Sequence, residues 1–323
     1  MEQVSQQEPF LEIKNLIVSY STPKGELKAV DRVSLTVNKG EILGVVGESG
    51  CGKSTLGLTL LKMLPSTGKV INGTIRLGQL DVLALRDEKL RRYRWEKVAM
   101  IFQSAMNALD PVKRVESQIA ETILQHKNMA REEAQARVRE LLQMVNIDPS
   151  RAKSYPHELS GGMRQRVVIA LALCLDSTIL IADEPTTALD VVVQAGVLRT
   201  LKNLQRKLGL TVILISHDIS IMWEISDRLA VMYAGKVVEL GPTKEIIERP
   251  QHPYTEALLN AVPVLGNKKK EIRGIPSSPP SLLSPPKGCR FHPRCPYAFD
   301  RCKVEEPPFI SVGKVKAACW LRT

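Results

Sequence analysis

Two glycine-containing runs in one chain constrain its fold more than any other feature. The first matches the pattern G-x-x-x-x-G-K-[ST] of a phosphate-binding loop, and its residues are Gly47, Glu48, Ser49, Gly50, Cys51, Gly52, Lys53 and Ser54. An apolar run, Ile42–Val46, precedes the loop, and a helical pattern over residues 53–64, stopped by Pro65, follows it. Such an order of buried strand, glycine-rich turn and helix predicts an α/β nucleotide-binding core.

The phosphate-binding loop predicts specific contacts with a nucleotide. Its glycines let backbone N–H groups close around phosphate oxygens, and the helix that follows points its positive end at them. We expect Lys53 to reach the terminal phosphates, the Ser54 hydroxyl to ligate Mg²⁺, and Thr55 to support the α-phosphate. The alternative is a glycine-rich turn without chemical meaning, and the surrounding motifs disfavour it.

Three further apolar runs end in polar residues, as buried strands of an open α/β sheet do. Residues 178–184 end in Asp183 and Glu184, residues 211–216 run into His217, and residues 98–103 end in Gln103. Because ligands bind at the carboxyl ends of such strands, Asp183 and Glu184 are candidates for a ligand-binding site. A surface acidic pair, a lone histidine or a lone glutamine would each be weak evidence if it stood alone.

Composition places the chain among ordinary globular proteins. With 323 residues, 44% of them hydrophobic, it can bury a full core. No run approaches the roughly 18 to 20 apolar residues that span a bilayer, and residues 1–8 lack a signal pattern, so we expect a cytoplasmic protein. The formal charge of +11 would suit nucleotides, nucleic acid or an anionic membrane face, but it also fits a solvated basic surface.

The second glycine-containing run, LSGGMRQR at residues 159–166, resembles the signature motif of the ATP-binding cassette (ABC) ATPases. This resemblance covers nearly the whole chain, and it implies one ABC ATPase domain over residues 8–265. Within that domain it implies a mainly parallel α/β core, an antiparallel β subdomain over roughly residues 10–80, and a helical subdomain over about residues 87–165. The apolar periodicity of residues 131–145 agrees with a helix there.

The same resemblance assigns roles to the polar residues at the strand ends. Asp183 resembles the acid that holds Mg²⁺, mostly through water, and Glu184 resembles the general base that polarises the attacking water. Gln103 matches the glutamine that touches Mg²⁺ or that water, and His217 the histidine that contacts the γ-phosphate. Tyr20 stands where the family places an aromatic ring against adenine, and the less favoured alternative is a strand tyrosine that packs on the sheet.

The family works as a dimer, and the signature explains why one chain is not enough. Ser160 is expected to cap a helix whose free N–H groups, at Gly161 and Gly162, close on the γ-phosphate of ATP held by the opposite subunit. Asp190, in the segment after Glu184, is expected at this dimer interface. Two such chains would sandwich two nucleotides, and a heterodimer of similar ATPases is the more common arrangement in this branch.

A segment near the carboxyl end narrows the branch. Residues 251–259, QHPYTEALL, resemble importers of oligopeptides, dipeptides and nickel, with related forms for oligosaccharides. We therefore expect an ATP-hydrolysing subunit at the cytoplasmic face of the membrane, working with two membrane permease subunits and an extracellular solute-binding protein. Which solute is carried is not encoded here. The rival is a soluble ABC ATPase that acts on nucleic acid or ribosomes; we expect no nucleic-acid partner, since the chain has one cassette.

Four of the six cysteines are concentrated in the last part of the chain, residues 266–323, behind a proline-rich linker. Cys289, Cys295, Cys302 and Cys319 have the spacing C-x5-C-x6-C-x16-C, and four thiolates suit zinc or an iron–sulfur cluster. The resemblance to the peptide-importer branch favours a [4Fe–4S] cluster over zinc, with free thiols or disulfides as a further alternative. We expect the metal to pin a tail that has little core of its own, and redox sensing is the alternative role.

Overall fold

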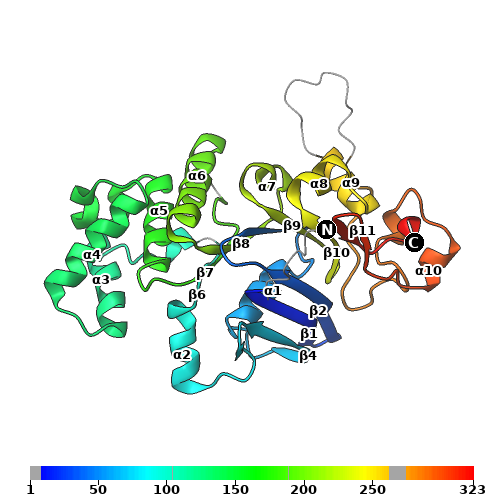
Figure 1. The fold of residues 1–323 in the computed structure, drawn as a ribbon, viewed down its shortest axis with the longest axis horizontal. Helices are drawn as coiled ribbons and strands as arrows, with labels where there is room; N and C mark the ends of the chain where they lie inside the picture. The colour runs from blue at the N-terminus through cyan, green and yellow to red at the C-terminus, as the bar shows by residue number, and fades with distance from the viewer. Residues whose placement is uncertain (1–8, 104, 188, 262–273) are drawn as a thin grey trace, which may run out of the picture. The chain divides into compact units, whose positions relative to one another are not determined.

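The protein is described by a computed structural model, which covers residues 9–103, 105–187, 189–261 and 274–323 (Figure 1). The chain divides into two compact units. Unit 1 comprises residues 1–84 and 215–323, and unit 2 comprises residues 85–214. The division falls within strand β8 (Thr211–Ser216). No helix of the described residues is long and apolar enough to cross a membrane.

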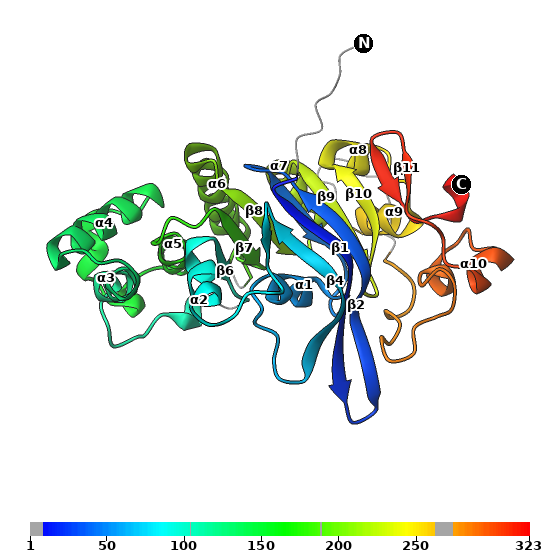
Figure 2. The ribbon, with the colours of Figure 1, turned by 60° about the horizontal axis from the view of Figure 1, so that its bottom comes forward.

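Unit 1 contains an antiparallel sheet with the strand order β2-β1-β4-β5. In Figure 2, β1, β2 and β4 lie side by side as long blue to cyan arrows. Alternate residues of β1, among them Leu11 and Ile13, are buried, as expected of a sheet with one covered face. The strands are β1 (Leu11–Thr22), β2 (Gly25–Val37), β4 (Gly68–Leu77) and β5 (Leu80–Asp81).

A second group of strands in unit 1 has the order β11-β12-β10-β9-β3. Strand β3 pairs in parallel with β9, and all five residues of β3 are buried, which explains its continuous apolar sequence. The remaining pairs are antiparallel. The strands are β3 (Ile42–Val46), β9 (Arg228–Tyr233), β10 (Lys236–Pro242), β11 (Ile310–Val312) and β12 (Val315–Ala317).

The helices of unit 1 are short. They are α1 (Lys53–Leu60), α7 (Ile219–Ile225), α8 (Thr243–Glu248), α9 (Pro253–Asn260) and α10 (Asp300–Val304). The predicted helix at residues 53–64 is therefore too long, because α1 ends at Leu60. Two residues later Lys62 adopts a left-handed backbone conformation with φ 52°, which turns the chain before Pro65.

Unit 2 combines a few parallel strands with most of the long helices. Strand β6 pairs in parallel with β7, and β8 lies next to β7. Helices α3, α4 and α5 pack together through buried apolar residues such as Ile119, Val138 and Val167. The elements are α2 (Asp87–Glu96), β6 (Val98–Ile101), α3 (Val115–His126), α4 (Arg131–Met144), α5 (Gly161–Ala172), β7 (Ile179–Asp183) and α6 (Val191–Leu208).

Candidate functional site

The candidate phosphate-binding loop connects β3 to α1 in unit 1, and two of its glycines have no room for a side chain. Gly47 has φ 153°, and a Cβ there would lie 2.1 Å from the carbonyl oxygen of Met232. Gly52 has φ 104°, and its Cβ would lie 2.1 Å from the carbonyl oxygen of Ala29. Because both backbones approach neighbouring strands so closely, glycine is required at each position. The loop therefore packs tightly against β2 and β9.

Lys53 lies across this loop rather than in solvent. Its Nζ donates to the carbonyl oxygens of Gly47 at 2.7 Å and Glu48 at 3.0 Å, and the residue is 5% exposed. Ser49, Gly50 and Ser54 are exposed, so the outer side of the loop is open. Successive backbone N–H groups of such a loop can form a concavity that binds anions, and Lys53 adds a cation beside it.

Cys51 and Thr55 of the loop region each interact with a nearby side chain. Burial raises the pKa of the Cys51 thiol, although Lys53 acts in the opposite direction, so Cys51 remains a neutral thiol. The hydroxyl oxygens of Tyr20 and Thr55 lie 3.2 Å apart and share a hydrogen bond. Tyr20 is half-buried at the end of β1, which keeps part of its ring accessible.

The acids of unit 2 follow β7, as the sequence predicts. Asp183 is the last residue of β7 and is buried. Glu184 adopts a left-handed conformation with φ 48°, and Gln103 donates through Nε2 to its carboxylate at 3.1 Å. Thr187 donates its hydroxyl to the same carboxylate oxygen, also at 3.1 Å. Gln103 and Glu184 are thus brought together, and Thr187 is a partner that the sequence analysis did not identify.

The signature residues stand at the start of α5. The Ser160 hydroxyl accepts a hydrogen bond from the backbone N–H of Met163 at 3.3 Å, so Ser160 caps the helix as predicted. Gly162 is buried, and a Cβ there would lie 2.5 Å from Cγ1 of Val193 in α6. A Cβ at Gly161 would lie 3.2 Å from Cδ2 of Leu189. These glycines therefore let α5 and the start of α6 approach each other.

Asp190 and His217 occupy the ends of other elements. Asp190 is exposed and caps α6, because its carboxylate accepts from the N–H of Val193 at 2.9 Å. His217 is exposed directly after β8, and Asp218 caps the following helix α7 by accepting from Ser220 at 2.8 Å. The candidate residues thus fall in both units. Unit 1 holds Tyr20, residues 47–55 and His217, and unit 2 holds Gln103, residues 160–162, Asp183, Glu184 and Asp190.

The phosphate-binding loop also has partners that the sequence did not reveal. The guanidinium of Arg294, from the cysteine-rich tail, binds both carboxylate oxygens of Glu48 at 2.6 and 2.9 Å. The backbone N–H of Glu48 donates to the Tyr254 hydroxyl at 2.9 Å. The chain separates Glu48 from these partners by more than 200 residues. No local pattern connects such distant positions, so only the folded structure identifies them.

The four tail cysteines line one small cavity, together with His252, Phe291 and other residues of unit 1. All six cysteines of the chain are free thiols. Burial, together with a smaller effect of the neighbouring thiols, raises the pKa of Cys289 to about 11. Among the described residues, however, no three Cys, His, Asp or Glu side chains are arranged to hold a metal ion. The predicted iron–sulfur cluster is therefore not confirmed, and neither is zinc.

Comparison with known proteins places these motifs in context. Residues 30–187 match the family described as ABC transporter, and residues 238–302 match the oligopeptide/dipeptide transporter C-terminal region. A dipeptide transport ATP-binding protein of Bacillus subtilis is 45% identical over 319 residues, covering 98% of this chain and 95% of the relative. An oligopeptide transport ATP-binding protein of Salmonella typhimurium is 43% identical over 311 residues, covering 95% and 92%.

Solved structures agree with the fold. A dimeric ATP-binding cassette in a post-hydrolysis state, bound to ADP and phosphate, superposes with a TM-score of 0.64 at 28% identity, covering 72% of this chain and 98% of the other. A Clostridium perfringens protein that is part of an ABC transporter complex gives a TM-score of 0.67 at 27% identity, covering 75% and 92%. The predicted α/β phosphate-loop fold with an antiparallel subdomain is confirmed.

Proposed function

This chain belongs to the oligopeptide and dipeptide family of ABC transporter ATP-binding proteins, and we propose how its residues perform ATP hydrolysis. It is the ATP-binding subunit of a dipeptide or oligopeptide importer and a translocase-class ATPase. The observation that carries the proposal is the phosphate loop, closed by Gly47 and Gly52 against neighbouring backbone with Lys53 at its centre. We also propose a division into an ABC ATPase domain at residues 8–265, with a helical part at about 87–165, and a tail at residues 266–323; residue 8 and the boundary at 265 lie outside the described residues.

ATP is bound by the loop and its neighbours. Backbone N–H groups of residues 49–55 surround the phosphates, while that of Glu48 donates to Tyr254, and the ammonium of Lys53 turns from the loop carbonyls to the β- and γ-phosphates. Mg²⁺, held by Ser54, Gln103 and Asp183, would neutralise charge that develops on the phosphates. The half-buried ring of Tyr20 stacks on adenine, with its hydroxyl anchored by Thr55.

Hydrolysis needs a base next to the attacking water, and Glu184 is proposed for this role. Its carboxylate takes the water proton, and the hydrogen bonds from Gln103 and Thr187 fix the orientation of that carboxylate. His217 contacts the γ-phosphate. Glu184 has a left-handed backbone conformation, and this conformation helps to set the direction of its side chain.

A second subunit completes the reaction. We propose that this chain, like the transport ATP-binding proteins that it resembles, works with two membrane permease subunits, a second ATPase and an extracellular solute-binding protein. We propose that Ser160, Gly161 and Gly162 close on the γ-phosphate bound by a different ATPase of the same family, and that Asp190 lies at that interface. The pair would act at the cytoplasmic face of the membrane. Peptides are the proposed solutes, and nickel and oligosaccharides are the alternatives.

Association with the natural partner ATPase tests the proposal directly. The two chains are mixed with and without Mg²⁺ and ATP, and light scattering follows their mass while released phosphate is counted. We expect nucleotide to increase association and phosphate to be produced. A Glu184→Gln chain should associate more durably, because it binds ATP but does not consume it. If nucleotide changes neither association nor phosphate release, the proposal is wrong.

For the tail, we propose that the cavity lined by Cys289, Cys295, Cys302 and Cys319 binds a metal cofactor, a [4Fe–4S] cluster or zinc. The support is that the four cysteines converge on one cavity, with Cys302 and Cys319 buried and Cys289 and Cys295 half-buried. Four thiolates would hold either cofactor. Anaerobic purification followed by iron, sulfide and zinc analysis decides between them. Zinc without iron excludes the cluster, and neither metal excludes both.

A further inference from the structure

Arg294 is a buried cation whose whole hydrogen-bonding capacity is used. Its side chain is 2% exposed, and it lies in a short turn of the tail, directly before Cys295. Nη1 and Nη2 bind the Glu48 carboxylate at 2.6 and 2.9 Å. The other donors reach the Tyr233 hydroxyl at 3.2 Å and the carbonyl oxygens of Pro276 at 2.8 Å and Ser277 at 3.0 Å. A guanidinium has five N–H groups, and each has a partner here.

The position of Glu48 makes this pair relevant to ATP. Glu48 is the second residue of the phosphate-binding loop, and its carboxylate brings a negative charge to a loop that receives several phosphate charges. Without a partner, that charge would repel the nucleotide. The two parallel hydrogen bonds from Arg294 neutralise the carboxylate and fix its direction. The adjacent N–H of Glu48 is fixed separately by the Tyr254 hydroxyl.

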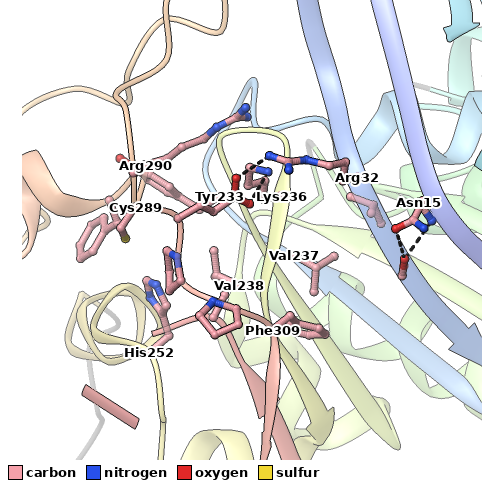
Figure 3. A pocket seen from close by; sticks show the side chains of 18 residues that line it. Asn15, Arg32, Tyr233, Lys236, Val237, Val238, His252, Cys289, Arg290 and Phe309 are labelled. Carbon is pink, nitrogen blue, oxygen red and sulfur yellow. Dashed lines mark hydrogen bonds and ion pairs between the residues drawn. The ribbon is translucent and has the colours of Figure 1, made fainter. Parts of the chain in front are cut away.

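A second arginine of the tail is linked to the loop through the turn at Ala234 and Gly235. Arg290, next to Cys289, donates to the Asp31 carboxylate and to the carbonyl oxygen of Ala234. The following residue, Gly235, donates its N–H to the carbonyl oxygen of Cys51 at 2.9 Å. Figure 3 shows Arg290 and Cys289 beside Tyr233, at the edge of a cavity of about 510 Å³ between the tail and β10. The tail therefore braces the loop near Glu48 and near Cys51.

We propose that Arg294 is a positioning residue for ATP, which neutralises Glu48 and holds the phosphate-binding loop in its receptive shape. The tail is thereby part of the nucleotide site, although it contributes no atom to catalysis. The inference rests on ATP binding at this loop, as proposed above. It predicts that loss of the arginine charge affects the binding of ATP rather than its turnover.

Steady-state hydrolysis by the full chain with its partner ATPase tests this inference. Arg294→Met removes the charge but keeps most of the side-chain volume. We expect the KM for ATP to rise by about tenfold, the scale of one uncompensated charge near the phosphates, with kcat changed by less than about threefold. Direct titration with a fluorescent ATP analogue should show the same loss of affinity. Arg301→Met, at an exposed arginine of the same tail, is the matched control and should leave KM unchanged.

The double variant Glu48→Gln with Arg294→Met separates charge from structure. With both charges removed, the KM should return to within about threefold of the wild-type value, because the repulsion has no source. If the double variant binds ATP as weakly as Arg294→Met, or if kcat falls while KM is unchanged, the inference is wrong. Should Arg294→Met fail to fold, Arg294→Lys replaces it: lysine keeps the charge but loses the two parallel hydrogen bonds, so KM should rise by less than about tenfold, and a larger rise or a fall in kcat would contradict the inference. A wild-type chain that binds no ATP would instead refute the function proposed above.

Discussion

At the scale of single residues, the site depends on positions where only one residue type fits. Glu184 must carry a carboxylate and also tolerate a left-handed backbone, and Gly162 must have no side chain at all. The first requirement is chemical and the second is steric. A substitution of Glu184 should therefore impair a reaction step, whereas a substitution of Gly162 should disturb packing.

Glu184→Gln should reduce phosphate release by about 10²- to 10⁴-fold, the usual contribution of a general base. ATP affinity should change little, because the amide is nearly the same size and still accepts from Gln103 and Thr187. Single-turnover phosphate release and ATP titration measure the two effects separately. Glu140→Gln, at an exposed position of α4, serves as the control. Unchanged hydrolysis would remove Glu184 from the mechanism.

Gly162→Ala should destabilise the protein by about 1 to 3 kcal/mol, the usual cost of forcing an extra carbon into a packed contact. The new Cβ would lie 2.5 Å from Cγ1 of Val193, so α5 and α6 must separate. Urea unfolding measures the loss. Combining the change with Val193→Ala should recover most of the stability, since the clashing methyl group is then absent. Equal losses in the single and double variants would show that the contact is not the cause.

At the scale of elements, ion pairs join the tail to β2. Asp31 in β2 is buried, accepts from Arg290, and lies 3.2 Å from Nζ of Lys236 in β10. Burial acts to raise the pKa of Asp31, but Lys236 and Arg290 outweigh it, so the pKa is lowered below its usual 3.8. The ionised carboxylate is therefore the form that stabilises the fold.

The pH dependence of this anchor follows from the direction of the shift. A lowered pKa in the folded state gives stability that is fully present above the unfolded value of 3.8 and is lost as the pH falls through the folded value. We expect Asp31→Asn to cost about 2 to 4 kcal/mol at pH 7, since it leaves buried cations without their anion. The cost should shrink below pH 4. Urea midpoints at several pH values measure this, and a cost independent of pH would contradict the assignment.

Sequence patterns predicted the bounds of several helices and strands. Continuous apolar runs predicted β3, β7 and β8 within a residue or so, because strands buried on both faces have that composition. The periodicity at residues 131–145 matches α4, and the predicted cap at Ser160 is present. Helix α1 is shorter than predicted, because the chain turns at Lys62 before it reaches Pro65.

Long-range partners could not be predicted. The phosphate-loop pattern identifies Glu48 but says nothing of Arg294, which is 246 positions away. In the same way, the cysteine spacing suggested a shared ligand, while the structure gathers the cysteines around one cavity without a metal-ligating arrangement in its described part. Side-chain pairs of this kind depend on the whole fold, and a single sequence carries no period or turn signal for them.

At the scale of the whole molecule, ligand binding and stability are linked. A nucleotide that binds only the folded chain stabilises it, by about 2.7 kcal/mol when its concentration is one hundred times the dissociation constant. The loop that binds it is packed against β2 and β9, so part of the core of unit 1 must be intact for binding. Thermal unfolding can therefore report nucleotide binding without any enzyme assay.

Saturating ATP with Mg²⁺ should raise the melting temperature by several degrees, as expected for a stabilisation of about 2 to 3 kcal/mol in a protein of this size. In Lys53→Ala the increase should largely vanish, because the cation at the centre of the loop is gone. Differential scanning fluorimetry measures both. Lys316→Ala, at an exposed position of β12, should keep the increase. The same shift in Lys53→Ala would contradict the site.

The pairing of β12 with β10 has a consequence for how the protein is made. Glu239 and Leu240 of β10 pair with Ala317 and Lys316, which leave the ribosome long after β10 does. Until then, the hydrogen-bonding edge of β10 is uncovered, and an uncovered edge strand is a template for pairing with other chains. A nascent or prematurely terminated chain that lacks β12 would thus be more prone to self-association than a chain in which β12 is paired. Strand β12 therefore protects the newly synthesised subunit.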